Sequence, residues 1–498
     1  MSARRRLALL CGAAFLYLLC RHAYYVGFFN DDAFYIIGAR SLLSGRYAEL
    51  NAPLAPPLVN YLPGFSLLLS PVAALAGRAL WPYQAASAAL LLAGLWWFSS
   101  LASALCPEDA WAALALAAFT PLAVSMSWTV LSDVPMLAAA MAALAWARRL
   151  WPEERPSRWL GLAALVGFAA LLRPTGAALA LAFALALACE RRWALSALSA
   201  SCAAAWLLPF LARNYALTGH ALLYVSELAA PYAGHGRWSI LAGTVLLNLA
   251  YYLRLVFETM LFRWPVAAAA GSPLTAATVG LGSVAAATGL SAAGWKGWAK
   301  LPALFLVLFL AAHLAWSKQA ARYLLPVLPL AFAYFLRGVR VLGARAGASR
   351  AAAPAAAILA LLLMLPTDLR VAEASWRRDS SVTRPPERTM AWVRGHTAPS
   401  DVFAVELDGR FYLLTGRRAL HLRRLSGPRA FARWLASSGA RYVAVFPDDY
   451  ALATKRGDAF DDPLPAAVLL SWLSDPARYR LDFSDPAERS AIYERLGR

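Results

Sequence analysis

The chain has 498 residues, of which 60% are hydrophobic and 15% are charged, and its mean hydropathy is +0.53. A soluble domain normally has about 25% charged residues, so this composition excludes a soluble globular protein. The formal net charge is +19. The sequence lacks the interleaving of basic and aromatic residues that binding to RNA or single-stranded DNA requires. It favours membrane lipids or phosphate as partners, and we expect no nucleic-acid partner.

The acidic residues are unevenly distributed along the chain. Residues 1–367 contain 11 of the 28 acidic residues and residues 368–498 contain 17. A segment poor in carboxylates followed by one rich in them indicates a polytopic membrane domain and then a water-facing domain. The domains expected are therefore 1–367, in the membrane, and 368–498, outside it.

The membrane domain shows eleven apolar stretches close to the roughly 17 to 25 residues that cross a bilayer. They are 7–27, 82–105, 110–131, 134–150, 159–172, 174–189, 193–211, 265–291, 301–316, 323–338 and 351–367. Two further stretches, 64–80 and 240–262, are interpreted as interfacial or partly buried helices. The sequence thus predicts an α-helical polytopic membrane protein with 11 to 13 transmembrane helices.

The side of each loop follows from the positions of Arg and Lys. The N-terminal helix lacks a small-residue cleavage site, so we expect it to be retained, with a cytoplasmic N-terminus. The positive-inside rule then places in the cytoplasm the basic loops 148–158, 190–192, 296–300 and 337–350, and only the CPED loop near residue 106 departs from it. An odd number of crossings puts the C-terminal domain on the extracytoplasmic face of a bacterial inner membrane.

The C-terminal domain alternates helical and strand-like segments, which predicts a small α/β fold. In chain order we expect a helix at ERTMAWVRGH, an apolar run at DVFAVEL, a strand-like segment at RFYLLTGRR, a helix at PRAFARWLASSG, a strand at RYVAVFP, a helix at PLPAAVLLSWL, and strand-like segments at YRLDF and SAIYERL. No phosphate loop or nucleophile elbow is present, so nothing in this domain argues for separate catalysis. The five cysteines all lie in or beside apolar segments, and we expect neither a disulfide framework nor a zinc site.

Three carboxylates are candidates for chemistry because they lie at the predicted outer edge of the membrane. Asp31 and Asp32 directly follow the first apolar stretch, where two adjacent carboxylates are costly unless solvated or used. Asp133 begins a later stretch, with Pro135 in its first turn. The alternatives are an ordinary solvated loop for the first pair and a helix N-cap for Asp133.

Five motifs, taken in order and spacing, resemble a known family. They are DDAFYIIGARSLLSGRY, YLPGFSLLLSPV, VLSDVPML, LPFLARNYALTG and ARYLLPVLPL. Together they resemble the lipid-linked-sugar glycosyltransferases of the C superfamily, and especially the bacterial relatives of protein O-mannosyltransferases and aminoarabinose transferases. The resemblance covers nearly all of residues 1–370.

This resemblance implies a function. Family members pass a sugar from a polyprenyl phosphate to an extracytoplasmic acceptor, with inversion at the anomeric carbon. The acceptor here is then a lipid, a protein or a polysaccharide, and neither a cofactor nor an obligatory metal ion is expected. The family's acidic pair corresponds to Asp31 and Asp32, where relatives often have Glu at the second position, and its later acid corresponds to Asp133.

The transfer also requires cations that stabilise the leaving phosphate. Four basic residues lie on the predicted outer side of the membrane, where the positive-inside rule does not expect them, namely Arg173, Arg213, Lys318 and Arg322. Arg binds phosphate through two parallel hydrogen bonds. The alternative for each residue is a side chain that extends to the lipid headgroups.

Two other classes of function remain as alternatives. A transporter or lipid flippase would normally show inverted repeats and charges near the bilayer midplane. No repeat is visible in this sequence, and its acidic candidates lie at one interface. The other alternative is an inactive assembly subunit of the same fold, against which the retention of all three carboxylates argues.

Overall fold

The computed structural model describes residues 1–223, 237–256, 273–348, 350–422, 425, 427–448 and 465–497. The chain divides into two compact units. The first unit contains Met1–Ala23, Ala85–Ser317 and Ala321–Trp376, and the second contains Tyr24–Gln84, Lys318–Ala320 and Arg377–Arg498. The second unit therefore joins the segment around Asp31 to the C-terminal domain. The end of the membrane domain at residue 367 stays a prediction.

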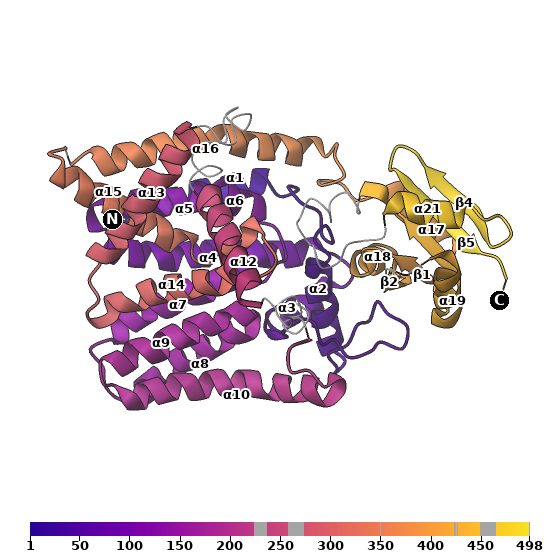
Figure 1. Cartoon of the computed structure of the whole chain (residues 1–498), viewed down its shortest axis with the longest axis horizontal. Helices are drawn as coiled ribbons and strands as arrows, with labels where there is room; N and C mark the ends of the chain where they lie inside the picture. Colours follow the sequence, from indigo (N-terminus) through magenta and orange to yellow (C-terminus); the bar gives the residue numbers. More distant parts are fainter. Residues whose placement is uncertain are drawn as a thin grey trace. The chain divides into compact units, whose positions relative to one another are not determined.

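The first unit consists of helices. They are α1 (Ala3–Leu19), α4 (from Trp81 to Leu105), α5 (Ala110–Phe119), α6 (Pro121–Met126), α7 (Asp133–Leu150), α8 (Pro156–Leu172), α9 (Ala177–Cys189), α10 (Trp193–Thr218), α12 (Arg237–Arg254), α13 (Pro273–Ala292), α14 (Lys300–Leu314), α15 (Leu328–Arg345) and α16 (Ala352–Arg377), with the short 3₁₀ helices η1 (Pro107–Asp109), η2 (Pro174–Gly176), η6 (Gly297–Ala299) and η7 (Ala321–Leu324). Helices α8, α9 and α10 pack side by side (Figure 1).

Each predicted span contains helix, as far as the structure describes it, but the span 7–27 is helical only to Leu19. Among the described residues, four helical segments are long and apolar enough to cross a membrane by length and composition, namely Trp81–Leu105, Trp193–Thr218, Gly297–Leu314 and Ala352–Arg377. Residues 257–262 and 265–272 of two predicted segments lie outside the described residues. The predicted fold class, a helical membrane protein with a C-terminal α/β domain, is confirmed.

The stretch predicted as one helix over 110–131 is instead two helices, α5 and α6. The break falls at Thr120, whose extended backbone (φ −68°, ψ 136°) precedes Pro121. Proline has no N–H to continue the hydrogen bonds of a helix and disfavours helical geometry in the residue before it. Proline at the first position of α6 therefore begins a new helix.

Glycines allow α13 and α15 to approach each other closely. A Cβ atom on Gly289 would lie 1.8 Å from the carbonyl oxygen of Tyr334, and one on Gly338 would lie 1.7 Å from that of Ala285. Neither position has room for a side chain. Small residues at such crossings let helix backbones touch, as is common where helices associate in membranes.

The second unit begins with α2 (Asp31–Leu42) and α3 (Gly64–Ala76), and its C-terminal part is an α/β fold. That part contains α17 (Glu387–His396), β1 (Val402–Val405), α18 (Asp408–Thr415), β2 (Arg418–His421), α19 (Pro428–Ser438), β3 (Tyr442–Val445), α21 (Ala466–Leu473), β4 (Tyr479–Asp485) and β5 (Ser490–Arg495). The strand order is β2-β1-β3-β5-β4. Strands β2, β1 and β3 are parallel, whereas β5 is antiparallel to both β3 and β4.

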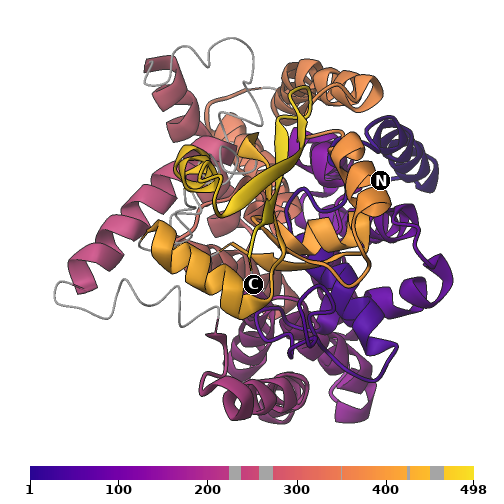
Figure 2. The same ribbon diagram turned by 90° about the vertical axis from the view of Figure 1, so that its right-hand side faces the viewer.

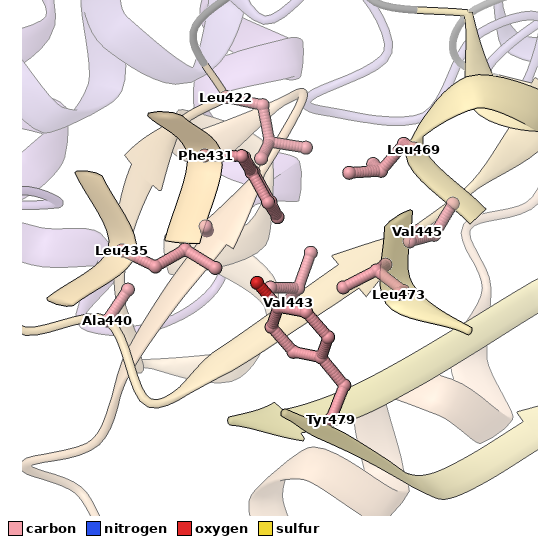
Figure 3. Packing of buried hydrophobic residues seen from close by; sticks show 10 residues of the cluster. Leu422, Phe431, Leu435, Ala440, Val443, Val445, Leu469, Leu473 and Tyr479 are labelled. Carbon is pink, nitrogen blue, oxygen red and sulfur yellow. The ribbon is translucent and has the colours of Figure 1, made fainter. Parts of the chain in front are cut away.

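The sheet is stabilised by apolar packing of helices against it (Figure 2). Phe431 and Leu435 of α19 and Leu473 of α21 meet Val443 and Val445 of β3 in one buried cluster (Figure 3). The burial of all four β3 residues matches the continuous apolar run expected of a central strand covered on both faces.

One predicted strand of this domain is wrong. The segment RFYLLTGRR was expected to be strand-like, but most of it belongs to helix α18, and β2 begins only at Arg418. Phe411 and Thr415 are both buried and lie four residues apart, on one face of a helix. Gly416 ends the helix with a left-handed backbone (φ 70°). Helical spacing of buried side chains therefore outweighs the strand preference of its aromatic residues.

Candidate active site

The acidic pair begins helix α2. Asp31 and Asp32 are its first two residues, where the partial positive charge of the helix N-terminus stabilises carboxylates. Asn30 precedes them with a left-handed backbone (φ 60°), which is uncommon for a residue other than glycine. The turn into the helix is thus an unusual one, and it determines where the two carboxylates point.

Asp32 is buried and holds the turn together. Only 2% of it is exposed, and its Oδ2 accepts a hydrogen bond from the backbone N–H of Gly27 at 2.7 Å. Its Oδ1 accepts from the N–H of Ala33 at 3.1 Å. Both oxygens of Asp32 therefore bind backbone groups of the segment that carries Asp31.

Asp31 is half-buried and is oriented by a phenol. Tyr61 donates its hydroxyl to Oδ1 of Asp31 at 2.9 Å. The ring of Tyr61 is stacked on Phe34, with centroids 5.1 Å apart, and lies edge-on to Tyr35. Burial and the charge of Asp31 raise the pKa of Tyr61 well above its usual value, so the phenol stays protonated and remains a donor.

A second carboxyl pair, Glu49 and Asp408, lies in the same unit. Burial raises the pKa of Asp408. Burial and the nearby Asp408 raise the pKa of Glu49 from 4.5 to about 7. Glu49 therefore keeps its proton in the folded protein up to a higher pH than in the unfolded chain.

The raised pKa of Glu49 predicts how the free energy of unfolding depends on pH. The folded state binds more protons than the unfolded state between about pH 4.5 and 7, so Glu49 lowers the free energy of unfolding as pH rises through this window. We expect Glu49→Gln to leave the thermal unfolding midpoint unchanged at pH 4, below the window, and to raise it at pH 8, measured by scanning fluorimetry in detergent. Glu154→Gln, at an exposed position, is the control. An equal effect of Glu49→Gln at both pH values would contradict this prediction.

The third carboxylate, Asp133, is ion-paired. It is the first residue of α7, and its side chain is 3% exposed. Its partner is Arg173, which lies in extended backbone between α8 and η2. This pair unites one predicted catalytic residue with one predicted phosphate-binding residue.

Two predicted cations lie against one tyrosine. The guanidinium of Arg173 is 5.1 Å from the centroid of the Tyr323 ring, and that of Arg322 is 5.5 Å from it. Asp133 is the ion-pair partner of Arg173 in this cluster. Guanidiniums gathered in this way can bind an anion such as phosphate.

Histidine 313 lies next to this cluster in α14. Its ring centroid is 5.4 Å from that of Tyr323, and 1% of the residue is exposed. Its Nδ1 is 2.8 Å from the carbonyl oxygen of Phe309, which can only accept, so Nδ1 carries a proton. Its buried Nε2 has no hydrogen-bond partner among the residues that the structure describes.

The other two predicted cations lie in α10 and in the segment just before η7. Arg213, near the end of α10, is 5.8 Å from the ring of Phe210 and donates to Oδ1 of Asn214 at 3.0 Å. Lys318 is half-buried and falls in the short segment of the second unit. Asp133, Arg173 and Arg322 thus gather in the first unit, and Asp31 and Asp32 in the second.

Two residues that shape these groups, Tyr323 and His313, were not predicted from the sequence. Tyr323 lies inside the quoted motif ARYLL, and only its position within that motif could have singled it out. The sequence indicates Tyr61 as a ring that could stack on sugar or belong to an interfacial aromatic belt, but not as the donor to Asp31. His313 is a lone histidine in an apolar run, a signal that more often marks a buried core residue. Across the described parts of the chain, no group of three or more metal-binding side chains is found.

The helical unit and the C-terminal α/β domain have the fold of known membrane proteins, the glycosyltransferases of the C superfamily. The chain has a TM-score of 0.60 to the aminoarabinose transferase ArnT of Cupriavidus metallidurans, at 13% identity over 98% of this chain and 97% of that one. ArnT bound to undecaprenyl phosphate gives a TM-score of 0.59 at 14% identity, over 99% and 98% of the two chains. The oligosaccharyltransferase of Archaeoglobus fulgidus, tethered to an acceptor peptide, gives 0.59 at 13% identity, over 100% and 74%.

The sequence agrees with this class. Residues 55–215 match the family model of dolichyl-phosphate-mannose-protein mannosyltransferases. No curated protein matches the sequence. The resemblance read from the five motifs is confirmed, and the chain is a multi-pass membrane protein with the fold of C-superfamily glycosyltransferases.

Proposed function

We propose that this chain transfers a monosaccharide from a polyprenyl phosphate to an extracytoplasmic acceptor, with inversion at the anomeric carbon. The observation that carries the proposal is the pair of guanidiniums, from Arg173 and Arg322, against Tyr323. A phosphate-linked donor needs such cations when its bond to the sugar breaks. ArnT was crystallised with undecaprenyl phosphate, and an archaeal oligosaccharyltransferase with dolichol phosphate and an inhibitory peptide.

The proposed reaction is a single displacement. An acceptor hydroxyl attacks the anomeric carbon while the bond from that carbon to the phosphate oxygen breaks. Asp31 takes the proton of the hydroxyl, as a general base must lie within hydrogen-bond reach of it. The leaving group is the polyprenyl phosphate, whose developing charge Arg322 and Arg173 stabilise.

Asp32 and Asp133 have supporting roles in this proposal. The backbone hydrogen bonds of Asp32 fix the turn before Asp31. Asp133 orients the Arg173 guanidinium by its ion pair. Arg213 and Lys318 are further candidates for contacts with the donor phosphate.

The test is a transfer assay with purified protein in liposomes. Polyprenyl phosphates carrying a hexose, a pentose or an aminosugar are supplied with extracted envelope material as the acceptor. Mass spectrometry should detect free polyprenyl phosphate and a glycosylated acceptor for one of these donors. Movement of the intact donor across the bilayer without cleavage would favour a flippase, and no cleavage of any donor would favour an assembly subunit.

We propose that the acceptor side is extracytoplasmic, with the C-terminal domain on that face of a bacterial inner membrane. A hydrogen-bonded pair supports the loop assignment: Arg340, within the basic segment 337–350, donates to Asp109 of the CPED loop at 2.7 and 2.6 Å. The CPED loop, which departs from the positive-inside rule, thus pairs with an arginine that is also assigned to the cytoplasmic side. Reporter fusions at residue 345 and after residue 380 are expected to report opposite sides, and the same side would contradict the topology.

A further inference from the structure

The N-terminus of helix α18 lies directly on the start of α2. Gly409 makes this approach possible, because a Cβ atom there would lie 3.1 Å from Oδ1 of Asn30 and 3.2 Å from both Ala33 and Phe34. These distances are tighter than ordinary contacts. The C-terminal domain therefore touches the first turn of the helix that carries Asp31.

The side chain of Asn30 is held at both ends by α18. Its Nδ2 donates to Oδ1 of Asp408 at 3.3 Å, and its Oδ1 accepts from the backbone N–H of Arg410 at 3.2 Å. Asn30 has the left-handed backbone that turns the chain into α2. A non-glycine residue keeps such a conformation only where its surroundings impose it.

Asp408 uses its second oxygen to bind another part of the same unit. Its Oδ2 accepts from Nδ2 of the fully buried Asn51 at 2.8 Å. The backbone oxygen of Asn51 in turn accepts from the N–H of Ala419 in β2 at 2.7 Å. One carboxylate thus joins the turn before α2, the loop after it and the C-terminal domain.

Arg410 provides a further anchor. Only 2% of this residue is exposed, and its Nη1 donates to the hydroxyl of Tyr25 at 2.8 Å. Gly27 leaves room for it, since a Cβ there would lie 2.5 Å from Cγ of Arg410. Tyr25, Gly27 and Asn30 all meet α18 just before Asp31.

We propose that Asp408 is a positioning residue for Asp31, and that through Asn30 the C-terminal domain fixes the direction of the catalytic carboxylate. The inference rests on the proposed function, in which Asp31 is the general base. It gives the C-terminal domain a role in the reaction although that domain contributes no reacting group. A base must be held in line with the hydroxyl it deprotonates, and a misplacement of about 1 Å can reduce the rate by about 100-fold.

The test uses two variants of nearly identical size. In Asp408→Asn, position 408 keeps one acceptor oxygen for two donors, Asn30 and Asn51, so one hydrogen bond is lost. Adding Asn51→Asp restores it, because the amide at 408 then donates to a carboxylate at 51 while its oxygen still accepts from Asn30. We expect Asp408→Asn to lower kcat by about 100-fold with KM for the donor within about twofold, and the double variant to recover most of kcat.

Hydrogen–deuterium exchange of residues 25–35 gives a readout that does not depend on transfer. Exchange there should rise in Asp408→Asn and return to the native level in the double variant. Asp401→Asn is the control, since Asp401 is also a buried carboxylate of this domain and pairs with Arg441 instead. It should change neither kcat nor the exchange of this segment.

Native kcat and native exchange in Asp408→Asn would overturn the inference, as would a double variant that fails to recover either. Asp31→Asn is assayed alongside, in order to separate the inference from the proposed function. If Asp31→Asn is inactive while Asp408→Asn is fully active, only the inference fails. If the native protein transfers no sugar or Asp31→Asn is fully active, the proposed function fails, and the exchange data still decide whether Asp408 holds the turn.

Discussion

Replacement of Asp31 by Asn is expected to lower the rate of sugar transfer by about 100-fold to 10,000-fold, the usual cost of losing a general base. Asn keeps the size of the side chain and still accepts the hydrogen bond from Tyr61, but it does not take up a proton at neutral pH. Initial rates of polyprenyl phosphate release, measured in liposomes at matched protein levels, check this expectation. The protein should still insert normally.

A second Asp→Asn replacement, away from the proposed site, controls for the chemical change itself. Asp475→Asn replaces a carboxylate that accepts from the backbone N–H of Ala477 at 3.0 Å in the C-terminal domain. Its transfer rate should equal that of the native protein. Undiminished transfer by Asp31→Asn would remove Asp31 from the mechanism, and Asp32 would then be the next carboxylate to replace.

Replacement of Arg322 by Gln is expected to lower transfer by at least about tenfold. A hydrogen bond to a charged group contributes about 1.5 to 3 kcal/mol, and about 1.4 kcal/mol corresponds to a factor of ten in rate. Arg322→Lys should recover only part of the activity, because an ammonium restores the charge without the two parallel hydrogen bonds. The assay is again the release of polyprenyl phosphate.

Arg149→Gln is the matched control for Arg322. Its guanidinium also lies over an aromatic ring, 5.7 Å from the centroid of Trp97, but in a segment to which we assign no role in binding. If both Arg322 variants transfer at the native rate, Arg322 only contacts lipid headgroups. The same two replacements at Arg213, by Lys and by Gln, then decide whether the donor phosphate is bound there.

Arg173 should behave differently from Arg322. Removal of one member of a buried ion pair leaves the other charge without compensation, which is usually strongly destabilising. Arg173→Gln would leave Asp133, with 3% of its side chain exposed, in that state. A loss of stability in Arg173→Gln that Asp133→Asn partly restores therefore reports the ion pair, whereas a loss of rate at unchanged stability reports phosphate binding.

Much of the molecule was predictable because local patterns determine it. Apolar stretches of bilayer length place the helices, since backbone polar groups in a membrane must be bonded within the segment. The helix at Asp133 and the strand at Val443 follow from local spacing in the same way. Helix α18 could not be predicted in this way, because its aromatic residues favour a strand. Only the burial of Phe411 and Thr415 on one face makes this segment a helix.

The sequence by itself also determined which residues are candidates, since carboxylates and arginines next to apolar segments are costly unless they have a use. Their partners were decided only by the tertiary structure. Arg173 and Arg322 are far apart in the chain, and nothing local indicates that both lie against Tyr323. Asp408 was likewise an ordinary residue of a tail, and only the packing of Gly409 on α2 brings it to Asn30. Composition and periodicity indicate whether a residue is buried, exposed or in the membrane. Contacts between distant segments depend instead on how whole helices and strands pack.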